Sequence, residues 1–232
     1  MDYALIVAGG RGSRMKIDTP KQFLDLNGKP ILCYTIQKFL AFDASLQIIL
    51  VLPESEIQSG VFVNTYFPNE YRISVAAGGE TRFHSVQNGL LQIPEHEGIV
   101  YIHDGVRPFV ANKVLLQCGE LARKTGSAIP SLSLKDSLRR IDNEHNLSVN
   151  RDEYRIIQTP QTFRINEIKN AYTQSYQRHF TDEASVFEQI GNKITLTEGN
   201  EENIKITTPQ DLQWARCYLS IENNLSEPLT TL

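Results

Sequence analysis

The sequence has few cysteines and no long apolar run, and each absence excludes a class of protein. The three cysteines among 232 residues lie far apart with no C-x-x-C pair, so neither a disulfide framework nor a zinc site is indicated. The longest strongly apolar run, 48–52, stops at Pro53, well short of the ~20 residues of a membrane span. The first residues lack the charged and apolar regions of a signal peptide. We therefore expect a cytoplasmic chain without a membrane partner.

An excess of positive charge is also missing. The 23 Lys and Arg residues against 27 Asp and Glu residues give a formal net charge of −4, which leaves no global field to attract nucleic-acid phosphates. A small anionic ligand needs only a few local cations and is not excluded. Hydrophobic residues at 41% and charged residues at 22% are typical of a globular chain. We expect no nucleic-acid partner and one domain spanning 1–232.

What the sequence does contain is an alternation of strand and helix patterns. Short apolar runs predict strands, and apolar residues at helical spacing follow each of them. The strand runs lie at 3–8, 47–52, 73–77 and 99–102. This alternation predicts right-handed crossovers and an α/β fold with a Rossmann-like, mostly parallel sheet flanked by helices on both faces. Ligands of such sheets bind outside the carboxyl ends of the strands, so functional residues are expected directly after each strand.

The segment 136–158 interrupts the alternation. Residues 137–141 and 147–150 flank a polar turn and predict an antiparallel β-hairpin arm. The arm has too few apolar residues for a core of its own, and an isolated two-stranded hairpin is marginal in water. It either folds back on the domain or docks against another subunit. We favour docking, because the α/β pattern before it is already complete.

A glycine-rich loop, Val7-Ala-Gly-Gly-Arg-Gly-Ser-Arg-Met15, follows the first strand. Glycines at this position allow backbone N–H groups to approach an anion closely. A dinucleotide fingerprint would need a third glycine where Met15 stands, and Gly28-Lys29 lacks the flanking residues of a P-loop. What remains is a glycine turn with two cations, Arg14 and Lys21, which indicates a polyphosphate site. The alternative is a tight turn with solvated charges.

Polar motifs also follow the third and fourth strands. Gly78-Gly79 comes directly after the third strand, and Thr81 is a candidate cap for the next helix. Asp104 ends the fourth strand, where it can accept hydrogen bonds from ligand hydroxyls. Arg107 can contact substrate or pair with Asp104 to hold the loop. We expect His103 to support this loop rather than to transfer protons.

Two later segments have structural interpretations. The run Thr181-Asp-Glu-Ala-Ser185 is typical of a helix start, with Thr181 as cap and acids in the first turn. Lys205 lies between Ile204 and Ile206, so strand alternation would place it on the face opposite the isoleucines. A surface lysine on an edge strand is one reading of this pattern.

Together these motifs resemble the signature of sugar-nucleotide pyrophosphorylases and nucleotidyltransferases, and most closely the 2-C-methyl-D-erythritol 4-phosphate cytidylyltransferase family. The resemblance covers nearly the whole chain in order. The matching stretches are Ala8-Gly-Gly-x-Gly-x-Arg-Met15, Pro20-Lys21-Gln22, Gly78–Leu90, Ile102–Pro108, Gln158–Phe163, Thr181–Ser185, Asn203–Thr207 and Pro209-x-Asp211-Leu212.

The resemblance implies an enzyme that transfers CMP from CTP to the phosphate of 2-C-methyl-D-erythritol 4-phosphate. The products would be pyrophosphate and 4-diphosphocytidyl-2-C-methyl-D-erythritol, in non-mevalonate isoprenoid precursor synthesis. It also implies Mg²⁺ held mainly through the CTP phosphates, with no metal site formed by the protein itself. The arm would reach the neighbouring subunit of a homodimer and thereby make the dimer the catalytic unit.

The resemblance also implies roles for individual residues. Arg14 and Lys21 would stabilise charge around the α-phosphate and the leaving pyrophosphate. Arg151 and Lys205 would hold the acceptor phosphate. The implied nucleotide contacts are Ala8, Gly9, Gly10, Gly12, Gly79, Glu80, Ser85, Asp104 and Gly105, and the other implied acceptor contacts are Arg107, Ser137 and Thr159.

Some positions leave alternatives open. Ser137 and Asn150 stand where the family more often has Thr and Asp. Gly9 and the pair 105–106 also occur in related D-ribitol-5-phosphate cytidylyltransferases, so CDP-ribitol formation is the alternative function. A nicotinamide oxidoreductase would share the α/β pattern, but its glycine fingerprint is broken here. A non-catalytic nucleotide sensor would not need the retained phosphate-binding cations.

Overall fold

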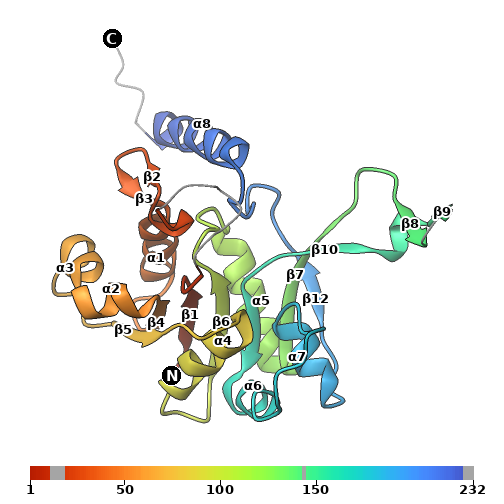
Figure 1. Ribbon diagram of the computed structural model, residues 1–232, viewed down its shortest axis with the longest axis horizontal. Coiled ribbons are helices and arrows are strands. Elements are labelled where there is room, and N and C mark those ends of the chain that lie inside the picture. The colour runs from red at the N-terminus through yellow and green to blue at the C-terminus, as the bar shows by residue number, and fades with distance from the viewer. Residues whose placement is uncertain (11–18, 143–144, 227–232) are drawn as a thin grey trace.

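The computed structural model describes residues 1–10, 19–142 and 145–226, and its centre is a mixed, mainly parallel sheet (Figure 1). The sheet order is β10-β7-β11-β6-β1-β4-β5, with β12 beside β7. Its strands are β1 (Tyr3–Val7), β4 (Gln47–Leu52), β5 (Ile73–Ala77), β6 (Ile99–Asp104), β7 (Ser127–Ser133), β10 (Arg155–Ile157), β11 (Gln161–Arg164) and β12 (Leu196–Glu198). Two small hairpins, β2 (Asp25–Leu26) with β3 (Lys29–Pro30) and β8 (Arg139–Asp142) with β9 (His145–Ser148), lie outside it.

The strands β6, β1, β4 and β5 pair in parallel, and β12 also runs parallel to β7. In the register, Val7 at the end of β1 lies opposite Val51 of β4 and Asp104 of β6. The carboxyl ends of these strands therefore meet at one edge of the sheet, as the alternating pattern predicts. The predicted α/β sheet is confirmed, and β11 adds an antiparallel strand between β6 and β7.

Helices cover both faces of this sheet (Figure 1). The α-helices are α1 (Ile31–Phe42), α2 (Glu54–Ser59), α3 (Val61–Tyr66), α4 (Arg82–Leu91), α5 (Asn112–Thr125), α6 (Ile165–Ala171), α7 (Glu183–Gln189) and α8 (Pro209–Ser226). Two 3-10 turns, η2 (Lys21–Phe23) and η3 (Arg151–Glu153), also occur. Most buried hydrophobic residues of α1 and α5 belong to one core cluster, those of α4, α6 and α7 belong to a second, and those of α8 belong to a third. Among the described helices, none is long and apolar enough to cross a membrane.

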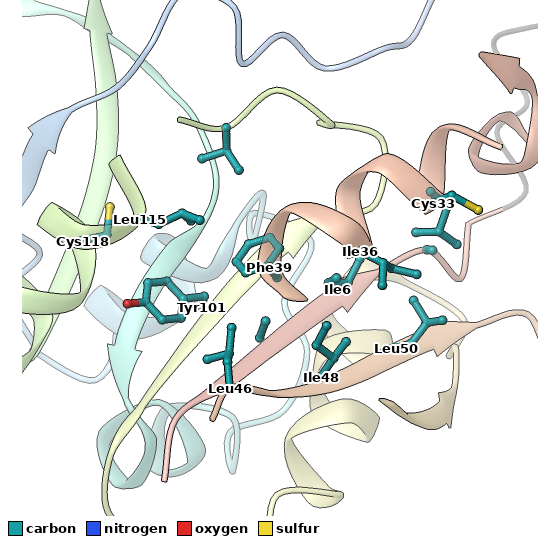
Figure 2. Close-up of a cluster of buried hydrophobic side chains, with 14 of the residues drawn as sticks. Ile6, Cys33, Ile36, Phe39, Leu46, Ile48, Leu50, Tyr101, Leu115 and Cys118 are labelled. Atoms are coloured by element: carbon teal, nitrogen blue, oxygen red, sulfur yellow. The ribbon is translucent and has the colours of Figure 1, made fainter. Parts of the chain in front are cut away.

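The core on the α1 side reaches the functional edge of the sheet. Figure 2 shows Ile36 and Phe39 of α1 above Ile6, Ile48 and Leu50 of the strands, all of them buried. The Phe39 ring also lies edge-on to the His103 ring, with centroids 5.1 Å apart. Because interiors are close-packed, this contact fixes the histidine that precedes Asp104.

The predicted hairpin is confirmed, and it projects away from the sheet (Figure 1). Arg139 pairs with Ser148 and Asp142 with His145 in an antiparallel register, and every residue of β8 and β9 is exposed. Ile141 is 72% exposed and Leu147 is 51% exposed. In this chain the hairpin therefore does not fold back on the domain, and its docking against another subunit stays a prediction.

Two local expectations are wrong. The cap of α7 is Asp182 rather than Thr181, because the Asp182 carboxylate accepts the Ser185 N–H while the Ser185 hydroxyl bonds back to the Asp182 N–H. The run around Lys205 is not a strand. Ile206 is buried, but its N–H donates to the Val106 carbonyl oxygen at 3.0 Å in an irregular segment before α8.

Candidate active site

A cavity of about 600 Å³ opens where β1 and β6 end. Its walls come from the first glycine loop, the loop after β5, the end of β6 and the segment before α8. The lining residues are Val7, Ala8, Gly9, Gly10, Lys21, Gln22, Gly79, Glu80, Thr81, Arg82, Ser85, Asp104, Val106 and Lys205. The cavity therefore lies at the carboxyl ends of the parallel strands, where such sheets bind ligands.

The described part of the first glycine loop is held by a buried side chain. Gln22 donates from Nε2 to the carbonyl oxygens of Ala8 at 2.6 Å and Gly10 at 3.0 Å. A Cβ placed on Gly9 would lie 3.1 Å from the Gly78 Cα, so the two glycine loops lie close together and a side chain here would fit only if the neighbouring loop shifted slightly. Lys21, on η2 beside Gln22, lines the same cavity.

The second glycine loop is stiffened by the start of α4. The prediction that Thr81 caps this helix is confirmed, because its hydroxyl accepts the His84 N–H. The Ser85 hydroxyl accepts the Gly79 N–H and donates to the Thr81 carbonyl oxygen, both at 3.0 Å. A Cβ on Gly79 would lie 2.4 Å from the Cβ of His84, so this position excludes a side chain. Ser85 therefore shapes the loop from within.

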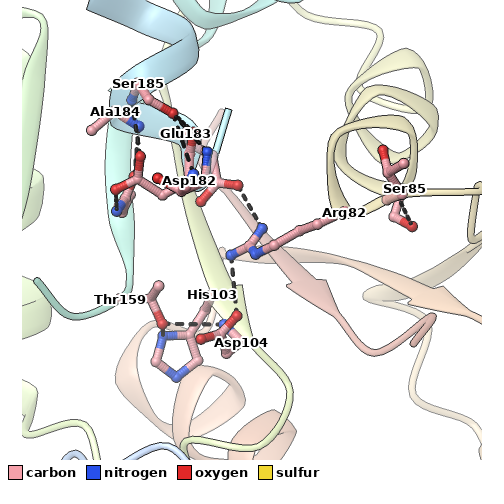
Figure 3. A network of polar contacts seen from close by, with 12 residues as sticks. Arg82, Ser85, His103, Asp104, Thr159, Asp182, Glu183, Ala184 and Ser185 are labelled. Carbon is pink, nitrogen blue, oxygen red and sulfur yellow. Dashed lines mark hydrogen bonds and ion pairs between the residues drawn. The ribbon is translucent and has the colours of Figure 1, made fainter. Parts of the chain in front are cut away.

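Asp104 is the centre of the charge network in this cavity (Figure 3). Its Oδ1 pairs with Arg82 at 3.1 Å, and its Oδ2 pairs with Arg107 Nε at 3.1 Å and with Lys205 Nζ at 3.0 Å. Burial alone would raise the pKa of Asp104, but the three cations hold it well below its ordinary value. The carboxylate is therefore ionised and fixed by groups from three segments of the chain.

Arg82 extends the network behind the cavity. Its Nη1 donates to the buried carboxylate of Glu183 at 2.5 Å, while Nη2 donates to Asp104 (Figure 3). Burial would lower the pKa of Arg82, but the two carboxylates raise it above its ordinary value. Burial raises the pKa of Glu183, and the charge of Arg82 opposes this rise.

Hydrogen bonds hold the His103 ring beneath the site, and its burial keeps it neutral. The Asp104 N–H donates to Thr159 Oγ1 at 3.1 Å, and this hydroxyl lies 3.0 Å from His103 Nδ1. His103 Nε2 lies 2.9 Å from the Arg107 carbonyl oxygen, so Nε2 carries the proton and Nδ1 accepts from Thr159. Burial lowers the pKa of His103 to about 4. This geometry supports the expected loop-holding role.

Besides its ion pair with Asp104, Arg107 also binds the loop that precedes Lys205. Its Nη1 donates to the Asn203 carbonyl oxygen at 2.7 Å, two residues before Lys205. The Asn203 side chain donates to the Thr159 carbonyl oxygen at 2.8 Å. These contacts show the pairing role that the sequence left open for Arg107, whereas its contact with an acceptor stays a prediction.

The arm residues lie apart from the cavity of their own chain. Arg151 is exposed on η3 and donates to the Lys135 carbonyl oxygen, and Ser137 lies at the base of the hairpin. Asn150 caps η3, since its side-chain oxygen accepts the Asp152 N–H at 3.2 Å. Asn150 can therefore cap this turn with its amide oxygen, as the carboxylate of an aspartate would.

The structure brings most of the predicted site residues together. Those that line the cavity are Ala8, Gly9, Gly10, Lys21, Gly79, Glu80, Ser85, Asp104 and Lys205. Those described but outside the lining are Gly105, Arg107, Ser137, Arg151 and Thr159. Gly12 and Arg14 lie outside the described residues, so their predicted roles stay predictions.

Sequence patterns missed three residues that organise the site: Gln22, Arg82 and Glu183. Arg82 and Glu183 lie 101 positions apart, and no spacing rule connects them. Glu183 also fits the acidic first turn of a helix, so its pattern gave no reason to look for a partner. The signal that could have found it is burial, because a buried carboxylate needs a cation.

Glycine loops after β1 and β5, with two lysines in the cavity between them, define a nucleotidyltransferase site. A family model described as "IspD: 2-C-methyl-D-erythritol 4-phosphate cytidylyltransferase" matches residues 3–221. The chain belongs to this family, and the resemblance of its motifs is confirmed.

Relatives of the family are similar over nearly their whole length. The 2-C-methyl-D-erythritol 4-phosphate cytidylyltransferase of Phocaeicola vulgatus is 46% identical over 94% of this chain and 99% of its own. That of Bacteroides thetaiotaomicron is 47% identical over 90% of this chain and 95% of its own. The crystal structure of the Francisella tularensis enzyme has a TM-score of 0.77 and 30% identity, over 93% of this chain and 98% of that one.

Proposed function

We propose that the described cavity is where this chain performs the reaction of its family. In that reaction the phosphate of 2-C-methyl-D-erythritol 4-phosphate attacks CTP, and pyrophosphate leaves. The observation that carries the proposal is the convergence of Lys21, Lys205 and the Asp104 network on one glycine-walled cavity. The named acceptor of the matching relatives favours methylerythritol phosphate over D-ribitol 5-phosphate for this chain.

The glycine loops supply the nucleotide side of the cavity. Gly9, Gly10 and Gly79 present backbone without side chains, so N–H groups can approach phosphate oxygens and base edges. Gln22 and Ser85 hold these loops from behind, which fixes them before the ligand arrives. A preformed loop loses little conformational entropy on binding, and this favours affinity.

The chemistry requires positioning and charge stabilisation rather than a covalent nucleophile on the protein. An oxygen of the acceptor phosphate forms a bond to the α-phosphorus of CTP while the bond to pyrophosphate breaks. Lys21 lines the cavity beside the first glycine loop, where its ammonium group can stabilise the charge that develops on the leaving group. Lys205, on the wall formed by Asp104, is suited to hold the acceptor phosphate.

The residues present fit a metal carried by the nucleotide. Among the described residues no group of three or more acidic, histidine or cysteine side chains gathers to hold an ion. Two carboxylates, Glu80 and Asp104, line the cavity, and Asp104 is already paired with three cations. Phosphate oxygens and water would therefore supply most of the ligands of Mg²⁺, which neutralises triphosphate charge when bound.

The arm would complete the site from a second copy of the chain. Arg151 projects on the exposed arm and lies outside the cavity lining of its own protomer. A homodimer in which each arm crosses to its neighbour would bring this arginine to the acceptor phosphate. Two cations, Arg151 and Lys205, would then offset the repulsion between the acceptor and the polyanionic CTP.

Steady-state kinetics with both substrates tests this assignment. Lys205→Ala is expected to raise the KM for the acceptor by roughly tenfold or more, because a phosphate loses a charge-assisted contact. Lys193→Ala, which removes a lysine outside the cavity lining, is the control. An unchanged acceptor KM in Lys205→Ala would contradict the placement of the acceptor.

A further inference from the structure

Glu183 is a buried carboxylate with a task beyond starting its helix. Its residue is 1% exposed, and burial of a charge is costly unless a partner offsets it. Asp182 and Ser185 already form the capping box of α7, so Glu183 is not needed there. Across the described chain, Arg82 is the one cation that pairs with it.

Arg82 uses its planar guanidinium as a fork between two carboxylates. One nitrogen, Nη1, bonds to Glu183 on α7, and the other, Nη2, bonds to Asp104 at the end of β6 (Figure 3). Asp104 in turn pairs through its second oxygen with Lys205. A continuous line of ion pairs therefore runs from α7 behind the cavity to the lysine on its wall.

The charges in this line are unevenly balanced. Three cations, Arg82, Arg107 and Lys205, face two carboxylates, Asp104 and Glu183. Without the Glu183 charge, Asp104 alone would have to neutralise all three cations. The contact of Arg82 with position 183 would then lose its charge assistance, so Arg82 would be held less firmly on the wall of the cavity that it lines.

We propose that Glu183 is a positioning residue for the acceptor side of the site. It holds Arg82 so that Oδ1 of Asp104 is fixed by one nitrogen, and Oδ2 stays directed at Lys205. Glu183 acts through Arg82 and touches no substrate. The inference rests on the proposed function, because it takes the ligand of Lys205 to be the acceptor phosphate.

The position predicts a particular kinetic signature for Glu183→Gln. This variant keeps the shape of the side chain and removes its charge, so the bond from Arg82 loses its charge assistance and Arg82 is held less firmly against Asp104. The KM for 2-C-methyl-D-erythritol 4-phosphate should rise by roughly tenfold, as expected when a hydrogen bond to a charged group is weakened. The turnover number and the KM for CTP should change by about threefold at most. A purely structural defect would give a different pattern, because it would lower the fraction of active enzyme and therefore the turnover number.

A double-mutant cycle separates positioning from general destabilisation. Arg82→Ala should raise the acceptor KM at least as much as Glu183→Gln does. In the Arg82→Ala background, Glu183→Gln should add less than about twofold, because the ion pair through which it acts on the site is gone. Glu70→Gln is the matched control and should leave the acceptor KM unchanged. It removes the ion pair between Glu70 and Arg72, whose charged atoms are 2.8 Å apart and which lies outside the cavity lining.

Two results would overturn the inference. One is an acceptor KM in Glu183→Gln equal to that of the unmodified chain while Lys205→Ala raises it. The other is a full additional effect of Glu183→Gln in the Arg82→Ala background. If Lys205→Ala also leaves the acceptor KM unchanged, the proposed placement of the acceptor fails instead. Should Glu183→Gln not fold, Glu183→Asp, which keeps the charge but shortens its reach, carries the same test and the same expected rise in KM.

Discussion

Single residues in this site differ mainly in how strongly their neighbours hold them. Asp104 is fixed by three cations and His103 by hydrogen bonds on both ring nitrogens. Asp104 is therefore a rigid part of the cavity wall, with His103 supporting it from beneath. Lys21 and Lys205 line the same cavity. Rigid placement of cations costs no reorganisation during reaction, which is how electrostatic catalysis works.

Lys21→Ala tests a cation that lines the cavity beside the first glycine loop. The turnover number is expected to fall by roughly 100- to 1,000-fold, the usual loss when a group stabilising transition-state charge is removed. CTP binding, measured by calorimetry, should change little. Lys29→Ala, an exposed lysine on β3, is the matched control. An unchanged turnover number would exclude the role of Lys21.

His103 gives the stability of the fold a defined pH dependence. Its folded-state pKa of about 4 lies below the ordinary value, so the unfolded chain binds more protons between about 6.5 and 4. The contribution of His103 to the free energy of unfolding is therefore present near pH 7 and is lost as the pH falls through this window.

The expected result is a stability difference between the unmodified chain and His103→Gln that shrinks by roughly 2 to 3 kcal/mol from pH 7 to pH 4. Urea unfolding at several pH values measures it. His96→Gln, which replaces an exposed histidine, should show no such trend. A difference that is constant with pH would mean that His103 is not held neutral.

Helices and strands position the residues of the site. Sequence patterns predict these helices and strands better than they predict contacts between distant side chains. The run 47–52 coincides with β4, because a buried strand of a parallel sheet is a continuous apolar segment, and the run 73–77 coincides with β5, an edge strand whose residues are mostly exposed. At Lys205 the alternation of apolar and polar residues indicated a strand, and that interpretation is wrong. There Ile206 is buried by bonding to Val106 and packing with α8, which local alternation cannot show. The Arg82–Glu183 pair was missed for the same reason.

The arm is the element whose function depends most on what lies beyond one chain. Arg151→Ala should raise the KM for the acceptor phosphate by roughly tenfold or more, with a smaller effect on CTP, because one of two phosphate cations is lost. Arg139→Ala is the matched control, since Arg139 bonds within the hairpin to Asn146. Equal acceptor KM values in the two variants would rule out the assignment of Arg151.

In the whole molecule, the arm lies apart from the cavity of its own chain. Complementation between two variants can therefore test whether the arm crosses to the other subunit of a dimer. Lys21→Ala and Arg151→Ala damage different parts of a site. If arms cross between subunits, a mixed dimer of the two variants contains one intact site. With the acceptor well below its KM, where Arg151→Ala alone is nearly inactive, co-refolding equal amounts should restore about a quarter of the unmodified activity, since half of the dimers are mixed and each has one working site of two. Activity no higher than the sum of the separate variants would show that the arm does not cross.

The central claim is that this chain, a member of the cytidylyltransferase family, uses the described cavity for methylerythritol phosphate. The most direct measurement is pyrophosphate release from CTP and Mg²⁺ with 2-C-methyl-D-erythritol 4-phosphate or D-ribitol 5-phosphate as the acceptor. We expect turnover with the branched acceptor, little with ribitol phosphate, and the loss of turnover in Lys21→Ala. Turnover with ribitol phosphate alone would contradict the assigned acceptor, and unchanged turnover in Lys21→Ala would contradict the assigned site.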